Sequence, residues 1–442
     1  MYNILKERAI KLRKRLNTKR GAKSQMIETK TTSKEIEFFD NFIFDDNNSV
    51  NLKTRKKEWP KNIPIDFSQT NNIKNKKNCP ADELIVWKNH ELHYSYLKSV
   101  DEDKRDKIAK DLLNYFMSYN WDKIRYDKEQ VEKDWENLKN IKTKITKRGK
   151  GIFIDNVSAS GTKIYKYFFP NVLKVSSKGK ISVYDALNDK EFLWKIIRNR
   201  MGNTLLYNTK NREARQWPMS IRPAMILQGA KCSGFSSVGS IFKPIVAKTI
   251  YERWVKNGDN VYDFSCGFGT RLLGLMSAGI KDVKYYGCEP NSETYDNLIK
   301  MSKYFGFNVD IRKRGSEDVI FKDKMGFVFS SPPYFNYESY CNEKTQCYNR
   351  YPDYEKWLER YWRKTVKNIK KMLKKNGVFA VNIGGLANPE MVRIAEDFKR
   401  IIKEEGFKLK ETWWMRTSRS HLTNKKKTGV LFKQEGIYFY GH

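Results

Sequence analysis

The stretch VYDFSCGFGTRLLG, residues 261–274, decides the fold that we predict for this chain of 442 residues. Its β-branched and aromatic start predicts a buried strand, and the apolar residues at its end predict a helix, with a glycine turn between them. Gly267 and Gly269 tolerate positive φ and carry no Cβ, so the backbone of such a turn can lie close to a ligand. The helix that follows presents unpaired N–H groups to the same place.

A second predicted strand, VKYYGCE, ends at Glu289, twenty residues after Gly269. A carboxylate at this strand tip is placed to accept hydrogen bonds from the two hydroxyls of a ribose. The turn and the carboxylate together indicate a site for a nucleoside cofactor. Leu272 stands where the commoner dinucleotide pattern has its third glycine, and a glycine turn that serves only strand–helix packing is the alternative at this point.

The segment FVFSSPPYFNY, residues 327–337, carries the second motif. Its hydrophobic start predicts the fourth strand of the same sheet. The two prolines cannot continue a central strand, so the chain must leave the sheet in a stiff turn. This turn places Ser331 and Tyr334 at the carboxyl end of the strands, where open α/β sheets bind ligands.

The motifs FSCGFGT, CEPN and SPPY, in that order, resemble those of the class I S-adenosylmethionine-dependent methyltransferases that modify exocyclic amines of DNA bases. That family has Asp, Asn or Ser before the two prolines and an aromatic residue after them. The resemblance covers roughly residues 237–442. It implies an α/β fold, a seven-stranded, Rossmann-like class I methyltransferase domain, and S-adenosylmethionine as the cofactor.

The resemblance also implies which residues form the site. The SPPY residues are expected to be catalytic: Ser331, Pro332, Pro333 and Tyr334. The residues expected to bind the cofactor lie before the first strand, in the glycine turn and at the tips of the second and third strands: Phe242, Lys243, Asp263, Phe264, Cys266, Gly267, Gly269, Thr270, Glu289, Pro290, Glu317 and Asp318. The match at Phe242 and Lys243 is loose, and a plain helix cap is the alternative there.

The expected chemistry follows from the amine. An exocyclic amine is a poor nucleophile because its lone pair is delocalised into the ring. Acceptors at Ser331 Oγ and the Pro332 carbonyl are expected to bind its two protons and free the lone pair, while Tyr334 stacks on a base flipped out of the duplex. The Ser form of the motif favours cytosine N4 over adenine N6, and RNA base methylation stays an alternative.

The charge of the chain indicates a polyanionic partner. Lys and Arg number 86 against 51 acidic residues, a formal net charge of +35. Nucleic acid, with DNA ahead of RNA, is favoured over a membrane because the chain has no apolar run of about twenty residues.

The six cysteines form no CxxC pair, so no metal is expected. A reducing cytoplasm, in a bacterial cell or a phage-infected host, is the expected location. No sequence pattern indicates the oligomeric state.

We expect four regions along the chain: a basic N-terminal helix or arm at 1–44, a linker at 45–80, an α+β region for nucleic-acid recognition at 81–236, and the methyltransferase domain at 237–442. In the third region, helical patterning gives way near residue 147 to strands with turns, and a helix follows near residue 189. Its expected core side chains are Leu112, Leu113, Phe116, Trp121, Ile124, Val131, Trp135 and Leu138.

Some basic and aromatic side chains outside the motifs are candidates for contacts with nucleic acid: Arg212, Arg215, Arg222, Tyr337, Arg416 and Arg419. The alternative is that the arginines are ordinary surface residues of a very basic protein. Two other classes of protein fit the sequence less well. A non-catalytic nucleic-acid-binding protein on a methyltransferase fold does not need intact motifs, and a nicotinamide-dependent oxidoreductase lacks the third glycine and has no use for SPPY.

Overall fold

The computed structural model describes residues 92–93, 101–121, 126–149, 151–155, 158–206, 220–221, 223–239, 241–384, 389–416 and 435–442. The elements that precede the glycine turn are β1 (Leu92–His93), α3 (Glu102–Met117), α4 (Lys128–Asn140), β2 (Ile145–Arg148), β3 (Gly151–Asp155), α5 (Thr162–Phe168), η3 (Pro170–Lys174), β4 (Ser176–Ser177), β5 (Ile181–Ser182), α6 (Val183–Asn188), α7 (Lys190–Leu206), β6 (Ser220–Ile221), α8 (Pro223–Lys231), β7 (Ser236–Ser237) and α9 (Pro244–Trp254).

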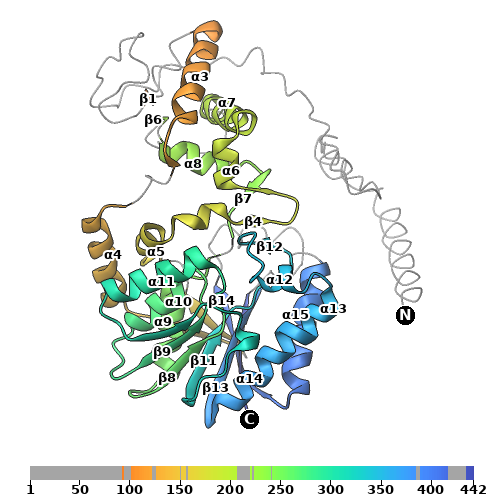
Figure 1. Ribbon diagram of the computed structural model, residues 1–442. Helices are drawn as coiled ribbons and strands as arrows, with labels where there is room; N and C mark the ends of the chain where they lie inside the picture. The colour runs from red at the N-terminus through yellow and green to blue at the C-terminus, as the bar shows by residue number, and fades with distance from the viewer. Residues whose placement is uncertain are drawn as a thin grey trace, which may run out of the picture. The chain divides into compact units, whose positions relative to one another are not determined.

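The remaining elements alternate between strands and helices (Figure 1). They are β8 (Asn260–Asp263), α10 (Thr270–Met276), β9 (Lys284–Cys288), α11 (Ser292–Tyr304), β10 (Val309–Arg312), η4 (Ser316–Asp318), β11 (Met325–Ser330), β12 (Glu338–Ser339), α12 (Cys347–Arg350), α13 (Tyr354–Trp357), η5 (Leu358–Arg363), α14 (Lys364–Met372), β13 (Leu373–Ile383), α15 (Pro389–Glu404), β14 (Lys408–Arg416) and β15 (Gly436–Gly441).

Within the described residues, the main sheet has nine strands in the order β10-β9-β8-β11-β13-β15-β14-β3-β2. The first five strands of this order pair in parallel, and β15 is antiparallel to both β13 and β14. The seven strands from β10 to β14 are those expected from the motifs, and the prediction of a Rossmann-like class I methyltransferase fold is confirmed. Because β8, β9, β11 and β13 are parallel, their carboxyl ends meet at one edge of the sheet.

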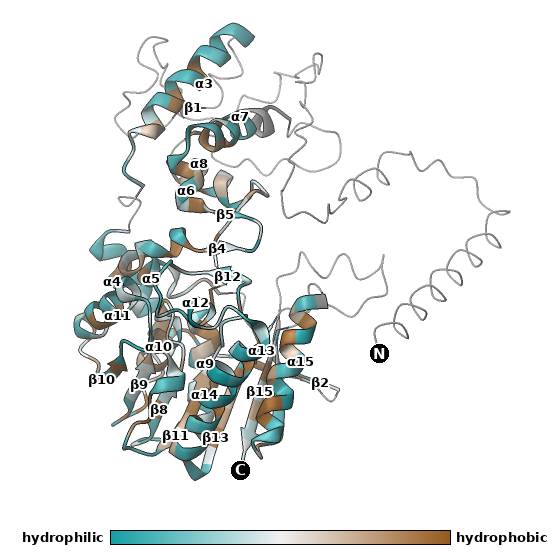
Figure 2. Ribbon diagram, turned by 45° about the vertical axis from the view of Figure 1, so that its right-hand side comes forward, coloured by the Kyte–Doolittle hydropathy of each residue, from teal (hydrophilic) through white to brown (hydrophobic). Residues whose placement is uncertain are grey.

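Alternating side chains give the sheet a separate core on each face. Val261 of β8 and Phe327 of β11 pack on one side with α9, α10 and α11. Tyr262 and Val328, the next residue of each strand, pack on the other side with α14 and α15. Figure 1 shows these two helical layers on either side of the sheet, and in Figure 2 the central strands are mostly brown. A strand buried on both faces gives the continuous apolar runs seen in the sequence.

Two strands from the N-terminal half extend this sheet. β2 and β3 form an antiparallel hairpin, and β3 pairs in parallel with β14, with Trp413 opposite Ile152. The expected boundary at residue 237 therefore does not coincide with the edge of the sheet. The segment after the hairpin is the short helix α5, which lies in a stretch where strands with turns were expected. The Asp134 carboxylate accepts hydrogen bonds from the N–H groups of Gly161 and Lys163 and caps this helix.

A third apolar core joins α3, α6, α7 and α8. The expected core residues Leu112, Leu113, Phe116 and Trp121 are buried in it. Val131 and Leu138 are also buried but belong to the sheet core, where the half-buried Trp135 packs against Phe305. Ile124, the expected arm at 1–44 and the expected linker at 45–80 lie outside the described residues. Within the described part of the chain, no helix combines the length and apolarity that a membrane crossing requires.

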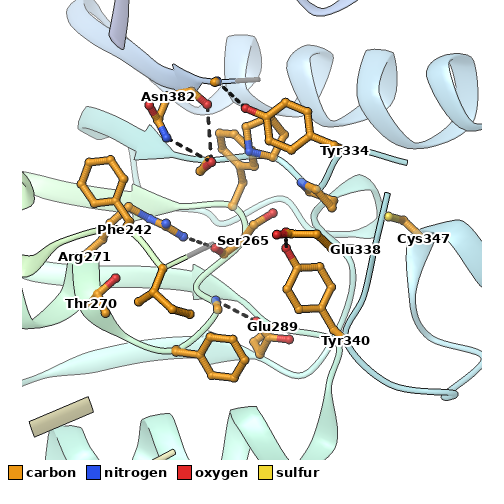
Figure 3. Close-up of a pocket in the computed structure, with 18 of the residues that line it drawn as sticks. Phe242, Ser265, Thr270, Arg271, Glu289, Tyr334, Glu338, Tyr340, Cys347 and Asn382 are labelled. Atoms are coloured by element: carbon orange, nitrogen blue, oxygen red, sulfur yellow. Dashed lines mark hydrogen bonds between the residues drawn. The ribbon is translucent and has the colours of Figure 1, made fainter. Parts of the chain in front are cut away.

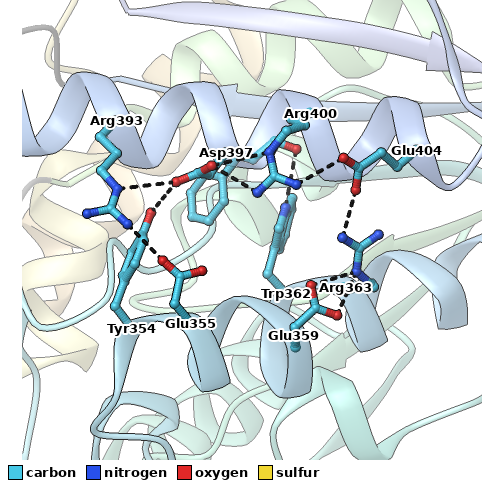
Figure 4. Close-up of polar contacts among 10 residues, drawn as sticks. Tyr354, Glu355, Glu359, Trp362, Arg363, Arg393, Asp397, Arg400 and Glu404 are labelled. Carbon is cyan, nitrogen blue, oxygen red and sulfur yellow. Dashed lines mark hydrogen bonds and ion pairs between the residues drawn. The ribbon is translucent and has the colours of Figure 1, made fainter. Parts of the chain in front are cut away.

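A long helix follows the SPPY motif and runs through α13, η5 and α14, and its middle part, η5, is a π-helical segment. It packs against α15, and Figure 4 shows the ion pairs along this contact. Arg363 contacts Glu404 and Glu405, and Arg400 contacts Asp397. Trp362 is buried beneath them, and its indole N–H donates to the Phe398 carbonyl. Partly exposed pairs of this kind contribute little individually, so the buried aromatic residues carry most of the stability.

Candidate functional site

A cavity of about 510 Å³ opens at the carboxyl ends of β8, β9, β11 and β13. Most of the residues predicted for the site line it: Phe242, Lys243, Phe264, Gly267, Thr270, Glu289, Pro290, Ser331, Pro332, Pro333, Tyr334 and Tyr337. Figure 3 shows Glu289 toward one end of this cavity and Asn382 with Tyr334 toward the other. The structure therefore brings the glycine turn, the acidic strand tip and the SPPY motif into one hollow.

The two glycines of the turn have different roles. Both have positive φ, +53° at Gly267 and +65° at Gly269. A Cβ at Gly267 would lie 3.9 Å from its nearest neighbour, the Ser265 carbonyl oxygen, so this position is open. A Cβ at Gly269 would lie only 2.5 Å from the Met301 methyl carbon. Gly267 keeps the backbone accessible to the cavity, whereas Gly269 allows α10 and α11 to approach closely.

Glu289 is fixed by the backbone on both sides. One carboxylate oxygen accepts a hydrogen bond of 2.8 Å from the Gly267 N–H, and the other accepts one of 2.9 Å from the Asn291 N–H. Burial raises the pKa of Glu289 to about 7, and the two N–H donors partly oppose this rise. Each carboxylate oxygen has a second lone pair, so the group still has acceptor capacity toward the cavity it lines.

Asp263 was expected to bind the cofactor, and the structure places it elsewhere. Its carboxylate is fully buried beneath the turn, outside the cavity lining. It accepts hydrogen bonds from Arg271 Nε at 2.7 Å, Tyr285 Oη at 2.8 Å and Ser330 Oγ at 2.6 Å. Arg271 also contacts the Ser265 carbonyl, which ties the turn to the helix that follows it. Asp263 is therefore the centre of a buried polar network that supports the turn.

Four further expected cofactor residues also lie outside the cavity lining. Cys266 is buried in the sheet core, and Gly269 faces α11. Glu317 and Asp318 both contact the Arg350 guanidinium, at 2.5 and 2.7 Å, and Asp318 also contacts Lys364. Glu317 is buried and Asp318 is partly exposed, and the ion pairs with Arg350 hold both carboxylates outside the cavity lining. Their neighbours Gly315 and Ser316 line it instead.

The SPPY residues form a turn in which Tyr334 is fixed by a hydrogen bond and Ser331 is not. Ser331 Oγ lies 3.4 Å from Asn382 Nδ2 and 3.5 Å from the Asn382 carbonyl, distances too long for strong hydrogen bonds. Tyr334 Oη accepts a hydrogen bond of 2.5 Å from the Gly384 N–H, and its ring packs 5.9 Å from that of Phe398. The Ser331 hydroxyl is thus available to a ligand, and the Tyr334 ring has a fixed position.

Sequence reasoning missed several polar residues of this cavity. Asn382, at the end of β13, lines it and has a buried Oδ1 without a hydrogen-bond partner among the described residues. Gln346 also lines it, and its Nε2 is buried without such a partner. Asn382 had a detectable signal, because it is a polar residue in the apolar run GVFAVNI, one position before the strand ends. Gln346 lies in an irregular loop and had none.

Two carboxylates were missed as well. Glu338 of β12, a strand that pairs with β4, is buried and accepts a hydrogen bond from Tyr340 Oη. Glu435 precedes β15 and packs against Gly384, where a Cβ would lie 2.8 Å from Glu435 Cγ. Burial raises the pKa of Glu435, and the Asn382 amide partly opposes this rise. Both line the cavity, and both are brought there by strand pairings that the sequence does not reveal.

The candidate nucleic-acid contacts are largely untested by the geometry. Arg212, Arg215, Arg222 and Arg419 lie outside the described residues, and of Arg416 only its place at the end of β14 is described. Tyr337 lines the cavity, and its carbonyl accepts a hydrogen bond of 2.7 Å from the Lys178 N–H. Among the described residues, no group of His, Cys, Asp or Glu side chains is arranged to hold a metal ion.

Comparisons with known proteins give structural neighbours only. No family model matches this chain, and no curated protein matches it. A S-adenosylmethionine-dependent methyltransferase from Clostridium acetobutylicum is similar with a TM-score of 0.30 and 13% identity, over 45% of this chain and 89% of that one. The fold assignment rests on the strand order of the sheet.

Two further solved structures are similar to the same share of the chain. TrmN from Thermus thermophilus has a TM-score of 0.31 and 13% identity, over 45% of this chain and 48% of that one. Fibrillarin from Aeropyrum pernix, solved with natively bound S-adenosyl-L-methionine, has a TM-score of 0.30 and 10% identity, over 45% of this chain and 74% of that one.

Proposed function

We propose that this protein is a methyltransferase that moves a methyl group from S-adenosylmethionine to an exocyclic amine of a nucleic-acid base, with DNA as the substrate and cytosine N4 favoured over adenine N6. One observation carries the proposal: a single cavity is lined by the open turn at Gly267, by the Glu289 carboxylate and by the whole SPPY motif. A fold that serves only to bind nucleic acid does not need these three features to converge.

The donors and acceptors around the cavity fit the cofactor. Gly267 leaves the turn open, so a nucleoside can approach the backbone there. Glu289 offers acceptors to ribose hydroxyls, and the unpartnered Gln346 Nε2 offers a donor to a ring nitrogen or a carboxylate. The volume of about 510 Å³ lies within the range of small-molecule sites. When bound, S-adenosylmethionine supplies an electrophilic methyl group attached to a sulfonium.

The residues around SPPY fit an amine. Ser331 Oγ, the Pro332 carbonyl and the unpartnered Asn382 Oδ1 are acceptors for its two protons. Hydrogen bonds to these acceptors draw the nitrogen toward tetrahedral geometry and free its lone pair. Fixed positions for both reactants supply about 7–11 kcal/mol of a barrier of this kind. Tyr334, held by Gly384, offers a ring face to the base.

The cavity also contains acceptors for the proton that the amine must release. Glu338 and Glu435 both line it, and Glu435 packs against Gly384, beside the SPPY end. No strong base is required, because the amine loses its proton only after it has become cationic. Two nearby carboxylates meet this requirement. They also compensate for the neutral Ser331, which cannot accept a proton in the way that the Asp form of the motif can.

DNA is proposed from charge and from the motif together. A net charge of +35 supports a polyanionic substrate, and residues 81–236 are proposed to take part in recognition. The target base must leave the duplex to reach a cavity of this kind, at a cost of a few kcal/mol that stacking and phosphate contacts offset. The Ser form of the motif supports cytosine over adenine.

The test is to incubate the purified protein with methyl-labelled S-adenosylmethionine and unmodified DNA or RNA, to digest the product to nucleosides and to identify the labelled one by mass spectrometry. Label in N4-methylcytosine from DNA is the expected result. Label in N6-methyladenine would correct the base, and label only in RNA nucleosides would correct the substrate. Label in no nucleoside, with no cofactor binding by calorimetry, would overturn the proposal.

A further inference from the structure

A second cavity, of about 340 Å³, is formed by residues of α5, η3 and α8 together with Trp121 and Tyr126. It has no part in the chemistry described above, yet Ile241 lines both cavities. Phe242, the next residue, lines the first one. A ligand in the second cavity would therefore lie directly behind the wall of the proposed catalytic site.

Two lysines line this second cavity. Lys166 comes from α5 and Lys231 from the last position of α8. Neither ammonium group has an ion-pair partner among the described residues. The Asp134 carboxylate acts on Lys166 through its charge, and it accepts hydrogen bonds from the N–H groups of Gly161 and Lys163. Among the described residues, the lining of the cavity thus contains two lysines and no acidic side chain.

The titration of these lysines agrees with the geometry. Burial, and to a smaller extent the neighbouring Lys166 ammonium, together lower the pKa of Lys231 to about 8. Burial also lowers the pKa of Lys166, while Asp134 partly restores it. Two like charges in a partly buried place destabilise the empty site, and a bound anion would remove that penalty.

Three aromatic residues, Trp121, Tyr126 and Tyr165, line the cavity beside the lysines, and the other lining residues are aliphatic apart from Gln228. Trp121 is 2% exposed, and its indole N–H has no hydrogen-bond partner among the described residues. Tyr126 lies 6.0 Å from Lys166 Nζ, measured to the ring centre, and Tyr165 forms another part of the wall. An unpartnered donor, two cations and aromatic rings suit a ligand that combines an anionic group with a flat ring.

We propose that this second cavity binds a nucleotide of the nucleic-acid substrate beside the target base, with its phosphate at Lys166 and Lys231 and its base against the aromatic side chains. This inference rests on the proposed function for the identity of the polymer. DNA and RNA share the recognising chemistry, and so does a free nucleotide. Ile241 lines both cavities, so a nucleotide in the second cavity would lie next to the target base and not far along the strand.

The test measures the affinity of a short fluorescent DNA duplex, of its single strand and of the RNA of the same sequence over a range of salt concentrations. The double variant Lys166→Met and Lys231→Met keeps the apolar stems and removes both charges. Lys110→Met with Lys190→Met is the matched control, because both residues are exposed and the charge change is the same. We expect roughly tenfold weaker binding for the cavity variant and a salt slope smaller by about one.

Wild-type protein provides a second readout that needs no variant. At neutral pH an amine with a lowered pKa reacts readily in reductive methylation, so Lys231 should be modified early. Bound oligonucleotide should protect Lys166 and Lys231 and leave Lys190 reactive, and peptide mass spectrometry reads each site. Deoxycytidine monophosphate alone serves as the probe for a free nucleotide. Protection by the monophosphate but not by the oligonucleotide would overturn the assignment to the polymer.

The outcomes separate this inference from the proposed function. If wild type methylates nucleic acid while the cavity variant binds it as the control variant does, the second cavity is not a nucleotide site. If the oligonucleotide protects both lysines and no methyl group is transferred, the inference stands and the proposed function fails. If the protein binds no nucleic acid, both are overturned.

Discussion

The Glu289 carboxylate accepts a hydrogen bond of 2.8 Å from the backbone N–H of Gly267, so the tip of β9 is bonded directly to the glycine turn after β8. This bond orients the carboxylate and fixes the open end of the turn at the same time. The two features that suggested a nucleoside site are therefore one unit. A change at Glu289 should affect the turn as well as any ligand.

Glu289→Gln should weaken binding of S-adenosylmethionine by at least tenfold. The Gln side chain has the same size and shape as Glu, but its NH2 group is a donor. This group would face the N–H of Gly267 or Asn291, so one of the two hydrogen bonds is lost. The loss of a hydrogen bond to a charged group costs about 1.5–3 kcal/mol. Isothermal calorimetry measures the change. Unchanged affinity, with an unchanged circular dichroism spectrum, would show that Glu289 does not contact the cofactor.

The affinity of wild type should also depend on pH. Because the pKa of Glu289 is raised to about 7, the ionised acceptor is lost as the pH falls below 7, and the dissociation constant should rise. Glu289→Gln should remove this dependence. The same raised pKa has an opposite effect on stability: the free energy of unfolding should fall as the pH rises from about 4.5 to about 7, because the folded state holds the proton more tightly. Binding and denaturation titrations from pH 5 to 8 test both signs.

Most of the fold could be predicted from the sequence because local signals agree with the sheet. Apolar runs mark the parallel strands, and glycine or proline follows at the strand ends. The β2–β3 hairpin could not be placed, because its pairing with β14 joins segments more than two hundred residues apart. The helix α5 was missed because its cap, Asp134, lies in another element.

The site residues could be predicted where the backbone conformation, or a position at the end of a strand, requires one type of residue. Gly267, Glu289 and Ser331 meet that condition. The buried position of Asp263 could not be predicted, because its partner Arg271 has no recognisable role before the turn is folded. Glu435 was missed because its position depends on the antiparallel pairing of β15 with β13. Sequence patterns indicate where a chain turns, whereas the partners of a buried charge depend on tertiary contacts.

Asp263→Asn should destabilise the protein without removing a direct ligand contact. The substitution leaves the Arg271 guanidinium buried without a counter-charge, and it removes an acceptor from Tyr285 or Ser330. Loss of one partner of a buried ion pair costs about 3–5 kcal/mol. Urea denaturation measures the change. Glu191→Gln, which breaks the exposed pair with Lys195, is the control and should cost less than about 1 kcal/mol.

Gly267→Ala and Gly269→Ala should separate the two roles in the turn. Each variant forces an alanine into a backbone conformation with positive φ, which lowers the free energy of unfolding by about 1–3 kcal/mol. Gly269→Ala also forces a methyl group against Met301 and should lower the melting temperature further. Gly267→Ala places its methyl group in open space beside the cavity and should weaken cofactor binding more than stability. Equal effects of the two variants on both properties would contradict this division.

Ser331→Ala and Asn382→Ala should each lower kcat on the order of a hundredfold and leave the dissociation constant of the cofactor unchanged, because each removes an acceptor for the target amine. Tyr334→Phe keeps the ring and loses only the bond to the Gly384 N–H, so its effect should be smaller. Single-turnover kinetics separate the chemical step from binding. A loss of cofactor affinity in Asn382→Ala would place that side chain at the wrong end of the cavity.

Glu317→Gln and Asp318→Asn distinguish the role expected from the family resemblance from the role seen in the structure. If these carboxylates bound the adenine ring, each variant would lose cofactor affinity by about tenfold, the loss typical of a hydrogen bond to a charged group. In the structure both contact Arg350, and Glu317 is buried while Asp318 is partly exposed.

Glu317→Gln should therefore lower the free energy of unfolding while cofactor affinity stays within about twofold of wild type. Asp318→Asn should change neither property much, since its pairs with Arg350 and Lys364 are partly solvated. Calorimetry and urea denaturation of both variants, read together, decide between the two assignments.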